Sequence, residues 1–332
     1  MSAKAAIPTT VLVAPDSFKG TYTALEVTAA IAAGLEAAGR PVDACPVADG
    51  GEGTLAVLTG ALGGELVEAE VHDPLGRPIE ATFALIDGGT RAIVETASAS
   101  GLGLIPAAER NAEAASTRGT GELIVAALEA GARTVLLGVG GSASTDGGAG
   151  AIAAIREAGG LGPARLTVLC DVQTPFEDAA RVYAPQKGAD RDAVHRLTRR
   201  LTGQARRLPR DPRGVAMTGA AGGLSGGLWA ALGAELVPGA AFVLDALQFD
   251  PRMRAARAVV TGEGCLDGQS LAGKAVSEVA TRARQAGVPC HAIVGARRLD
   301  AFGARILDLQ AILEATTLEQ IEAAGAELAS LL

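Results

Sequence analysis

Along the amino-terminal part of the chain, short apolar runs alternate with polar loops and amphipathic stretches. The run at residues 10–14, rich in β-branched side chains, predicts a buried strand, and residues 23–38 predict a helix that ends at a glycine. Residues 42–47 predict a second strand, which leads through the glycine-rich loop 48–54 into another helix. Because strand, polar loop and helix follow one another twice, we expect a parallel sheet whose loops gather at one edge.

The pattern changes in the middle of the chain. Residues 65–71, 79–86 and 90–95 predict three strands, and the sequences Asp-Pro-Leu-Gly and Asp-Gly-Gly between them predict hairpin turns. Residues 119–130 then predict a helix, and the apolar run 134–139 predicts a further strand. This part of the chain is therefore expected to mix antiparallel and parallel pairing.

Towards the carboxyl terminus the strand–loop–helix order returns. An arginine-rich stretch at residues 190–213 first predicts an exposed helix and loop. Residues 256–260 then predict a strand, 261–267 a polar loop, 271–286 a helix and 288–294 another strand.

These patterns predict an α/β protein of two domains. Residues 1–64 and 254–332 are expected to form one parallel α/β domain from both chain ends, and residues 65–253 a mixed α/β domain inserted between them. A cleft between two such domains is a usual place for small-molecule chemistry.

Composition narrows the class of protein. Hydrophobic residues make up 48% of the 332 residues and charged residues 20%, which excludes wholesale disorder. The 37 acidic residues outnumber the 29 basic ones and give a net charge of −8, so we expect no nucleic-acid partner.

The spacing of the cysteines and the length of the apolar runs indicate the cellular compartment of the protein. The four cysteines and three histidines are scattered without metal-binding spacing, which predicts reduced thiols and a cytoplasmic protein. The first ten residues carry no long apolar run, so we expect no secretory signal. No uninterrupted apolar stretch reaches about 18 residues, so we expect no membrane span.

Lysine is rare in this chain, which is otherwise rich in arginine. Of its four lysines, Lys19, Lys187 and Lys274 each lie in a polar motif that contains glycine, whereas Lys4 belongs to the terminal segment. A compact ammonium group binds phosphate as a point charge, a role that arginine fills differently. The three lysines are therefore candidates for phosphate binding.

Five polar, glycine-rich segments follow apolar runs, and each contains a serine, lysine or acidic residue. They are residues 16–20, 49–54, 140–150, 185–188 and 261–273. Backbone amides in such loops can approach a phosphate closely, and a helix that follows adds its positive end. Together they predict a site for a phosphoanion and a divalent cation.

Common nucleotide motifs are incomplete. Residues 268–275 have Walker A spacing, but Ala275 stands where a hydroxyl should hold Mg²⁺. The first strand is followed by no dinucleotide fingerprint, and neither a nucleophile elbow nor the protein-kinase motifs occur.

Acidic side chains follow the predicted strands. Asp16, Asp49, Asp171 and Glu263 lie at or within three residues of the end of an apolar run. The carboxyl ends of parallel strands meet at one edge of a sheet, where ligands bind. Mg²⁺ takes a few carboxylates together with phosphate oxygens, and phosphoryl transfer to an alcohol needs a carboxylate that orients the hydroxyl.

Several of these motifs, in order along nearly the whole chain, resemble those of the type I glycerate kinase family. The matching segments are 16–20, 46–54, 119–124, 140–142, 146–150, 185–189, 219–223, 261–264 and 266–267. The resemblance implies ATP-dependent phosphorylation of D-glycerate, in bacteria usually at the 2-hydroxyl to give 2-phosphoglycerate and ADP, with Mg²⁺ as cofactor. It also implies a flavodoxin-like domain and a domain that resembles a restriction-enzyme core.

Residue roles follow as expectations, with the two domains closing on MgATP and glycerate. The expected catalytic residues are Asp16, Lys19, Asp49 and Glu263. The residues expected to bind substrate or phosphate are Ser17, Gly50, Gly51, Glu52, Arg118, Gly141, Ser142, Asp146, Gln186, Lys187, Asp267 and Lys274. The expected metal ligands are Asp49, Asp171 and Glu263. Glycerate and ATP are the expected small-molecule partners of a monomer or homodimer.

Two segments depart from the family pattern. Ser144 and Thr145 stand before Asp146 where the family usually has Thr-Asn, and Cys265 stands where it commonly has Arg. Two alternatives stay open: a kinase of another small hydroxy acid, and a catalytically silent regulator that binds a sugar acid. The sequence leaves open which hydroxyl is phosphorylated and which carboxylate is the base.

Overall fold

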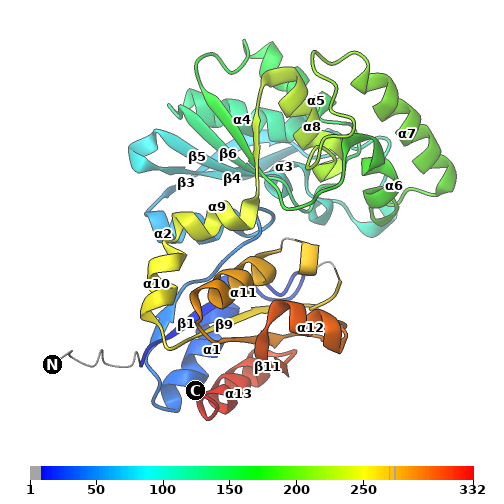
Figure 1. The fold of residues 1–332 in the computed structure, drawn as a ribbon. Helices are drawn as coiled ribbons and strands as arrows, with labels where there is room; N and C mark the ends of the chain where they lie inside the picture. The colour runs from blue at the N-terminus through cyan, green and yellow to red at the C-terminus, as the bar shows by residue number, and fades with distance from the viewer. Residues whose placement is uncertain (1–8, 269, 273) are drawn as a thin grey trace. The chain divides into compact units, whose positions relative to one another are not determined.

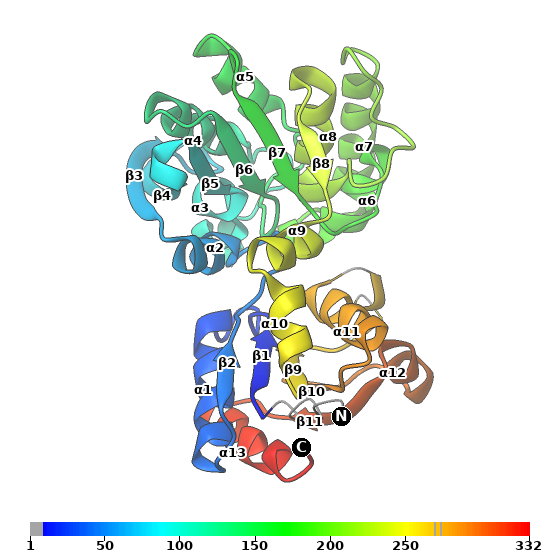
Figure 2. The ribbon, with the colours of Figure 1, turned by 60° about the vertical axis from the view of Figure 1, so that its left-hand side comes forward.

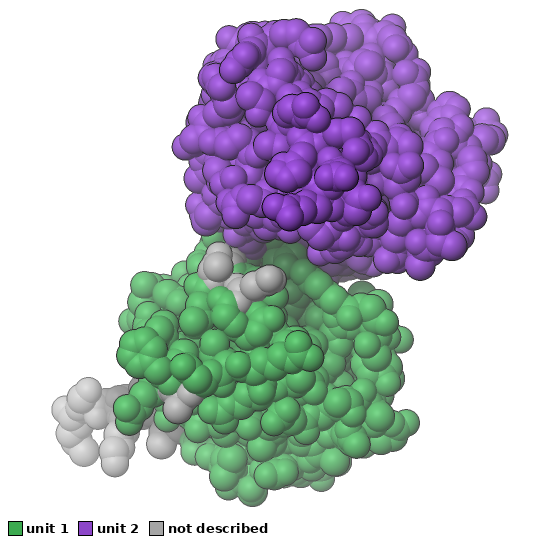
Figure 3. Space-filling model, turned by 90° about the vertical axis from the view of Figure 1, so that its right-hand side faces the viewer, with its two compact units in different colours: residues 1–49, 240–332 green, residues 50–239 purple. Residues whose placement is uncertain are grey.

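The computed structural model describes residues 9–268, 270–272 and 274–332. The chain divides into two compact units, unit 1 (residues 1–49 and 240–332) and unit 2 (residues 50–239) (Figure 3). The divisions after residues 49 and 239 differ from those expected after 64 and 253, and they place the helix Thr54–Leu62 in unit 2. Lys4 and two positions of the segment with Walker A spacing lie outside the described residues.

Unit 1 is built on a five-stranded parallel sheet with the order β11-β10-β9-β1-β2 (Figures 1 and 2). Its strands are β1 (Val11–Pro15), β2 (Val42–Ala44), β9 (Ala258–Glu263), β10 (Cys290–Val294) and β11 (Leu309–Glu314). Counted along the chain as strands one to five, they give the order 2-1-3-4-5, which is the flavodoxin-like doubly wound topology. The expectation of a parallel domain from both chain ends is confirmed.

Helices cover both faces of this sheet. The helices of this part of the chain are α1 (Ala24–Ala37), α9 (Gly239–Ala246), α10 (Phe249–Ala255), α11 (Ala275–Ala286), α12 (Ala301–Leu307) and α13 (Leu318–Ala329). Helices α1 and α13 pack against each other on one face, and α11 contacts the sheet on the other (Figure 2). Between α1, α13 and the sheet, Val13, Ile31, Ile293 and Leu328 belong to one fully buried apolar cluster.

Unit 2 carries a mixed sheet with the order β3-β4-β5-β6-β7-β8. Its strands are β3 (Glu65–His72), β4 (Pro78–Ile86), β5 (Arg91–Glu95), β6 (Thr134–Gly138), β7 (Arg165–Leu169) and β8 (Glu235–Val237). The pairs β3–β4 and β4–β5 are antiparallel, as the two turn motifs predicted, and the remaining pairs are parallel. The carboxyl ends of β5, β6 and β7 therefore lie at one edge of the sheet.

The helices of unit 2 complete its core. They are α2 (Thr54–Leu62), α3 (Thr96–Ser100), α4 (Arg118–Glu129), α5 (Ala149–Glu157), α6 (Ala179–Tyr183), α7 (Arg191–Ala205) and α8 (Ala220–Leu232). Helix α4 contacts β3 to β6, and α5 packs between α4 and α8. The arginine-rich stretch forms α7 as predicted, but Leu197 and Leu201 bury one face of it against α6. No helix in the described ranges has the length and apolar character needed to cross a bilayer.

Near the later loop of unit 1, two element boundaries were wrong in the sequence analysis. The strand expected to end at residue 260 continues to Glu263, because β9 pairs in parallel with β10 as far as Glu263 opposite Val294. The helix expected from residue 271 begins at Ala275, preceded by Lys274 in an extended conformation. The expected loop 261–267 is thus partly strand, and Glu263 is held by the sheet.

Candidate functional site

The strand order of unit 1 places a ligand-binding position between β1 and β9. The chain leaves β1 towards β2 on one side and returns to β9 on the other, so the connections after these neighbouring strands diverge. Ligands of doubly wound sheets bind in the crevice outside the carboxyl ends of the strands at this switch point. Asp16 directly follows β1 and Glu263 is the last residue of β9.

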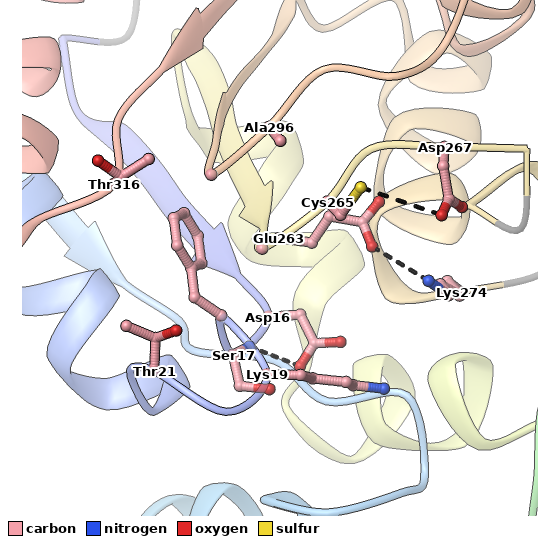
Figure 4. Close-up of a pocket in the computed structure, with 13 residues that line it drawn as sticks. Asp16, Ser17, Lys19, Thr21, Glu263, Cys265, Asp267, Lys274, Ala296 and Thr316 are labelled. Carbon is pink, nitrogen blue, oxygen red and sulfur yellow. Dashed lines mark hydrogen bonds and ion pairs between the residues drawn. The ribbon is translucent and has the colours of Figure 1, made fainter. Parts of the chain in front are cut away.

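A pocket of about 330 Å³ lies at this switch point (Figure 4). Six residues expected from the sequence line it: Asp16, Ser17, Lys19, Glu263, Asp267 and Lys274. Figure 4 shows Asp16, Lys19 and Glu263 extending into the same space. The residues come from the loop after β1 and, far along the chain, from the end of β9 and the segment before α11.

Asp16 is the most perturbed carboxyl group of this pocket. It is only 4% exposed, and its Oδ1 accepts a hydrogen bond of 2.6 Å from the backbone N–H of Ser17. Burial and the neighbouring negative charge of Asp49 raise the pKa of Asp16 to about 7, against the opposing effect of Lys19. Its carboxyl group therefore titrates near physiological pH.

Lys19 joins two loops of unit 1. Its Nζ lies 2.6 Å from Oδ2 of Asp49, on the loop after β2, while the lysine side chain is about half exposed. Burial opposes the charge of Lys19, but Asp49 and Asp16 outweigh it and raise the lysine pKa. Lys19 thus stays protonated beside two carboxyl groups.

Glu263 and Lys274 form the other side of the pocket. Lys274 Nζ lies 3.5 Å from Glu263 Oε2, and Glu263 is 6% exposed. Burial raises the pKa of Glu263, although Ser270 and Lys274 lower it. Among the residues that the structure describes, Glu263 Oε1 is buried without a hydrogen-bond partner. Such a group has room for one more donor or a cation.

Cys265, where the family pattern has Arg, also lines this pocket. Its Sγ lies 4.0 Å from Oδ2 of Asp267, a contact drawn in Figure 4. A thiol brings no positive charge, so Lys19 and Lys274 supply the cationic charge along this lining.

A second polar cluster lies in unit 2, at the loop that follows β6. The Nζ of Lys187 donates hydrogen bonds to Ser142 Oγ at 2.8 Å and to the Ser144 carbonyl at 2.5 Å. Lys187 is 2% exposed, and this burial lowers its pKa to about 7, with Asp146 opposing the shift. Burying an amine with no carboxylate paired to it lowers the stability of the folded protein. Groups with pKa values perturbed in this way cluster at functional sites.

Asp146 supports the same loop from inside. Its Oδ2 accepts hydrogen bonds from the N–H and hydroxyl of Thr117 and from the N–H of Gly150, and its Oδ1 accepts one from the N–H of Gly148, at 2.8 to 3.1 Å. The carboxylate thereby ties the start of α4 to the start of α5. Asp146 is placed to hold the loop, while Ser142 and Lys187 carry its polar side chains.

Two glycine loops of unit 2 touch each other. A Cβ added at Gly140 would lie 2.7 Å from the Cα of Gly51, and one added at Gly141, whose φ is +63°, would lie 3.3 Å from Glu52 Oε2. Gly50 has a φ of +85° and equally little space. Glycine is therefore required where these loops meet, which brings Gly50, Gly51 and Glu52 beside Gly141.

Comparison with known proteins shows the family of this chain. The family model described as the glycerate kinase family matches residues 11–158 and 158–331. The chain belongs to the glycerate kinase family. It is therefore an enzyme, a kinase.

Named relatives and a solved structure agree with this membership. A glycerate kinase of Bacillus subtilis is 38% identical over 86% of this chain and 84% of its own length. A glycerate kinase of Haemophilus influenzae is 39% identical over 87% and 86%, and a glycerate 2-kinase of Escherichia coli is 36% identical over 86% and 84%. A crystal structure from Salmonella typhimurium LT2, described as that of a candidate glycerate kinase 2, superposes with a TM-score of 0.81 at 32% identity and 98% coverage of both chains.

Three further site residues expected from the sequence, Arg118, Gln186 and Asp171, lie in unit 2 of this glycerate kinase family member. Arg118 forms ion pairs with Glu122 and Glu157, at 2.9 and 2.7 Å. Gln186 is exposed beside the buried Lys187, and Asp171 follows β7 in unit 2. Arg118 thus has its charge neutralised within unit 2.

Some lining residues of the unit 1 pocket gave no signal in the sequence. Thr316, on the loop after β11, and Ala296, after β10, reach the pocket because both loops follow parallel strands of the same sheet. No motif distinguishes either residue, and only the strand order shows that they belong there.

The residues of the unit 1 pocket fit a loosely held divalent cation. Across the described part of the chain, no three acidic, histidine or cysteine side chains are grouped to hold a metal. The partnerless Oε1 of Glu263 and the mutual repulsion of Asp16 and Asp49 would both be relieved by a cation. Mg²⁺ is usually bound by one or two carboxylates together with phosphate oxygens and water, so no closed cage is needed.

Proposed function

We propose that this kinase transfers the γ-phosphoryl group of ATP to the 2-hydroxyl of D-glycerate, giving 2-phosphoglycerate and ADP. The relatives named glycerate kinase and glycerate 2-kinase support the acceptor and the position. The observation that carries the chemistry is Asp16, a buried carboxyl group at the switch point whose pKa is raised to about 7 beside Lys19. We place the reaction in the cytoplasm, where ATP is the phosphoryl donor, with a monomer or homodimer as the working form.

Asp16 would orient the acceptor hydroxyl and accept its proton. A carboxylate that titrates near the working pH combines a useful basicity with a large deprotonated fraction. As the acceptor oxygen bonds to the γ-phosphorus, the bond from that phosphorus to the β,γ-bridging oxygen breaks and ADP leaves. The proton moves from the hydroxyl to Asp16, so atoms and charge balance.

Lys19 and Lys274 would neutralise charge on the transferring group. Lys19 is protonated and its side chain is half exposed, and Lys274 contacts Glu263 at the opposite side of the pocket. Phosphoryl transfer depends mainly on positioning and on stabilising the charge of the equatorial oxygens, which suits two ammonium groups.

Asp49 and Glu263 are the residues of unit 1 that would hold Mg²⁺. The cation, when bound with the nucleotide, supplies charge neutralisation on the β- and γ-phosphates. Lys19 contributes here as well, because its ion pair fixes the carboxylate of Asp49.

The cluster of unit 2 would bind an anionic part of the substrates. Ser142 and Lys187 offer hydrogen-bond donors beside the glycines at 140 and 141. Backbone amides in a loop with left-handed glycines can line an anion site, and the following helix α5 adds its positive end.

Release of ADP with a panel of acceptors tests the proposal. We expect turnover with D-glycerate to exceed that with glycolate, L-lactate and tartrate by at least about tenfold in kcat/KM, since discrimination among small polar substrates is commonly this large. A preference for another of these acids would make the protein a kinase of that acid. No ADP release with any of them would contradict the proposal.

A further inference from the structure

Cys265 is the thiol of unit 1 that lines the switch-point pocket. It follows the end of β9 by two residues, is partly exposed, and belongs to the lining of this pocket of about 330 Å³. Figure 4 shows its sulfur on the side of the pocket that Glu263 and Lys274 form. Its thiol makes one weak contact, with Asp267 Oδ2 at 4.0 Å, so the sulfur is open to a reagent that enters the pocket.

The other three cysteines of the chain are closed off from solvent. Cys45, Cys170 and Cys290 are only 1%, 2% and 3% exposed. Burial raises the pKa of the Cys45 thiol to about 11 and those of Cys170 and Cys290 to about 12. The thiolate is the nucleophile in exchange with a disulfide, and buried thiols are inert. Of the four cysteines, Cys265 is therefore the one that a reagent in solution reaches.

A second observation, independent of the cysteine, marks the same pocket as a ligand site. Glu263 is 6% exposed, and among the described residues its Oε1 is buried without a hydrogen-bond partner. Glu263 lines the pocket, and Figure 4 shows its side chain extending into it. A buried polar atom without a partner is rare in a folded protein, and a ligand in the pocket would satisfy this one. An adduct on Cys265 would thus compete with that ligand for space.

The backbone on both sides of Cys265 is held in place. Leu266 is fully buried, and its N–H donates to the Ala296 carbonyl at 2.9 Å. On the other side, a Cβ added at Gly264 would lie 3.2 Å from the Cα of Phe18, so the two backbone segments are in close contact. Cys265 is therefore fixed at the pocket wall, and a group attached to its sulfur stays in the pocket.

We propose that Cys265 is a modification site, at which a low-molecular-weight disulfide attaches reversibly, fills the switch-point pocket and stops turnover. The thiolate sulfur of Cys265 attacks one sulfur of the reagent, and the S–S bond of the reagent breaks as the new one forms. The departing thiolate takes up the proton that Cys265 lost. A dithiol reductant reverses the exchange and is itself oxidised to a disulfide. This inference rests on the proposed function, because it takes this pocket as the place where nucleotide phosphate binds.

The test treats the folded protein with dithiodipyridine, an uncharged disulfide whose released thiopyridone is measured by absorbance. The proteins are the wild type, Cys265→Ala and the matched control Cys45→Ala, which removes a buried thiol of the same unit. Mass spectrometry of peptides locates the adduct. ADP release with D-glycerate gives the turnover of each treated protein relative to its own untreated rate. The labelling is repeated with ATP and Mg²⁺ present.

We expect the adduct of the wild-type protein on Cys265 alone, with turnover lowered at least about tenfold and restored by dithiothreitol. ATP with Mg²⁺, well above its Kd, should slow the labelling at least about fivefold, because the occupied pocket excludes the reagent. Cys45→Ala should behave as the wild type does. Cys265→Ala should take up no label and keep its own untreated rate.

An adduct on another cysteine, or a labelled Cys265 with turnover unchanged, would overturn the inference while leaving the proposed function standing. Labelling that ATP does not slow would overturn it equally. Should Cys265→Ala fail to fold, the location of the adduct in the wild-type protein and the reversal by dithiothreitol decide the same question. If the untreated wild-type protein releases no ADP with D-glycerate, the proposed function itself fails, and that result is separate because it needs no reagent.

Discussion

The Nζ of Lys19 lies 2.6 Å from Oδ2 of Asp49, so one ion pair joins the loop after β1 to the loop after β2. The two residues are 30 positions apart, and the parallel pairing of β1 with β2 brings their loops to the same edge of the sheet. Asp16 lies next to this pair and responds to both charges. The switch-point pocket thus holds interacting charges, in which Asp49 raises and Lys19 lowers the pKa of Asp16.

Replacing Lys19 removes the cation of this set. We expect Lys19→Ala to lower kcat/KM for ATP and D-glycerate at least about tenfold, because a charge that stabilises the transferring phosphoryl group is lost. Since the side chain is half exposed, the melting temperature should change little. Steady-state ADP release and a thermal melt measure both quantities. A folded variant with an unchanged rate would remove Lys19 from the site.

Asp16 predicts a pH profile. Since its pKa is raised to about 7, the deprotonated fraction needed for accepting a proton falls below this pH. We expect kcat/KM of the wild-type protein to decrease as pH falls from 8 to 6, and Asp16→Asn to lose at least about 100-fold at pH 8. A wild-type profile that is flat across this range would contradict the role of Asp16 as base.

The same pKa has a consequence for stability. A carboxyl group whose pKa is raised on folding keeps its proton in the folded state while the unfolded chain loses it, so this group lowers stability as pH rises from about 4 to 7. Asp16→Asn removes this destabilising ionisable group. We expect its melting temperature to exceed that of the wild-type protein by a few degrees at pH 8 and to match it near pH 4. Equal melting temperatures at pH 8 would show that Asp16 is not destabilised by burial.

The positions of Asp16 and Glu263 were predicted only in part from the sequence. The apolar runs predicted that each follows a strand, and the parallel pattern predicted that strand ends meet. That β1 and β9 are direct neighbours could not be predicted, because pairing between segments so distant in sequence depends on packing of the whole sheet. The hydrogen bond from Thr261 Oγ1 to the Ala14 carbonyl, at 2.9 Å, spans 247 positions.

Two arginines of unit 2, Arg118 and Arg110, show what the sequence could not predict. Arg118 was expected to bind substrate or phosphate in place of the arginine that Cys265 replaces, and the structure pairs it with glutamates of its own helix and of α5. Arg110 lies in a segment without a glycine-rich or lysine motif, and among the described residues its buried Nε has no hydrogen-bond partner. Charge satisfaction is a property of the tertiary structure and leaves no local pattern in the sequence.

Lys187 should make stability depend on pH in the other direction. Its pKa is lowered to about 7, so between pH 7 and about 10 the unfolded chain binds a proton that the folded chain does not, and stability rises with pH. We expect urea unfolding at pH 7 and pH 9 to show this gain in the wild-type protein and a smaller gain in Lys187→Met. The variant should also lose at least about 100-fold in turnover if the lysine contacts a reacting anion. Identical pH dependence of both proteins would contradict a neutralised, buried Lys187.

Replacing Asp146 is expected to lower the stability of unit 2. Its carboxylate accepts four hydrogen bonds that join α4, α5 and the serine loop. We expect Asp146→Ala to lower the free energy of unfolding by about 2–4 kcal/mol, because buried donors are left without acceptors. Asp146→Asn, which keeps one carbonyl oxygen as an acceptor, should lose less. Chemical unfolding measures both, and a loss below about 0.5 kcal/mol in Asp146→Ala would mean that the carboxylate does not hold the loop.

Phosphorus NMR of the product formed from ATP and D-glycerate tests the central claim most directly. A phosphate on the 2-hydroxyl is attached to a carbon that carries one proton, and a phosphate on the 3-hydroxyl to a carbon that carries two. We predict a new phosphomonoester signal split into a doublet, appearing together with ADP in the wild-type protein and absent with Asp16→Asn. A triplet would contradict the proposed position of transfer. A doublet formed equally fast by Asp16→Asn would contradict the proposal that the switch-point pocket is the catalytic centre.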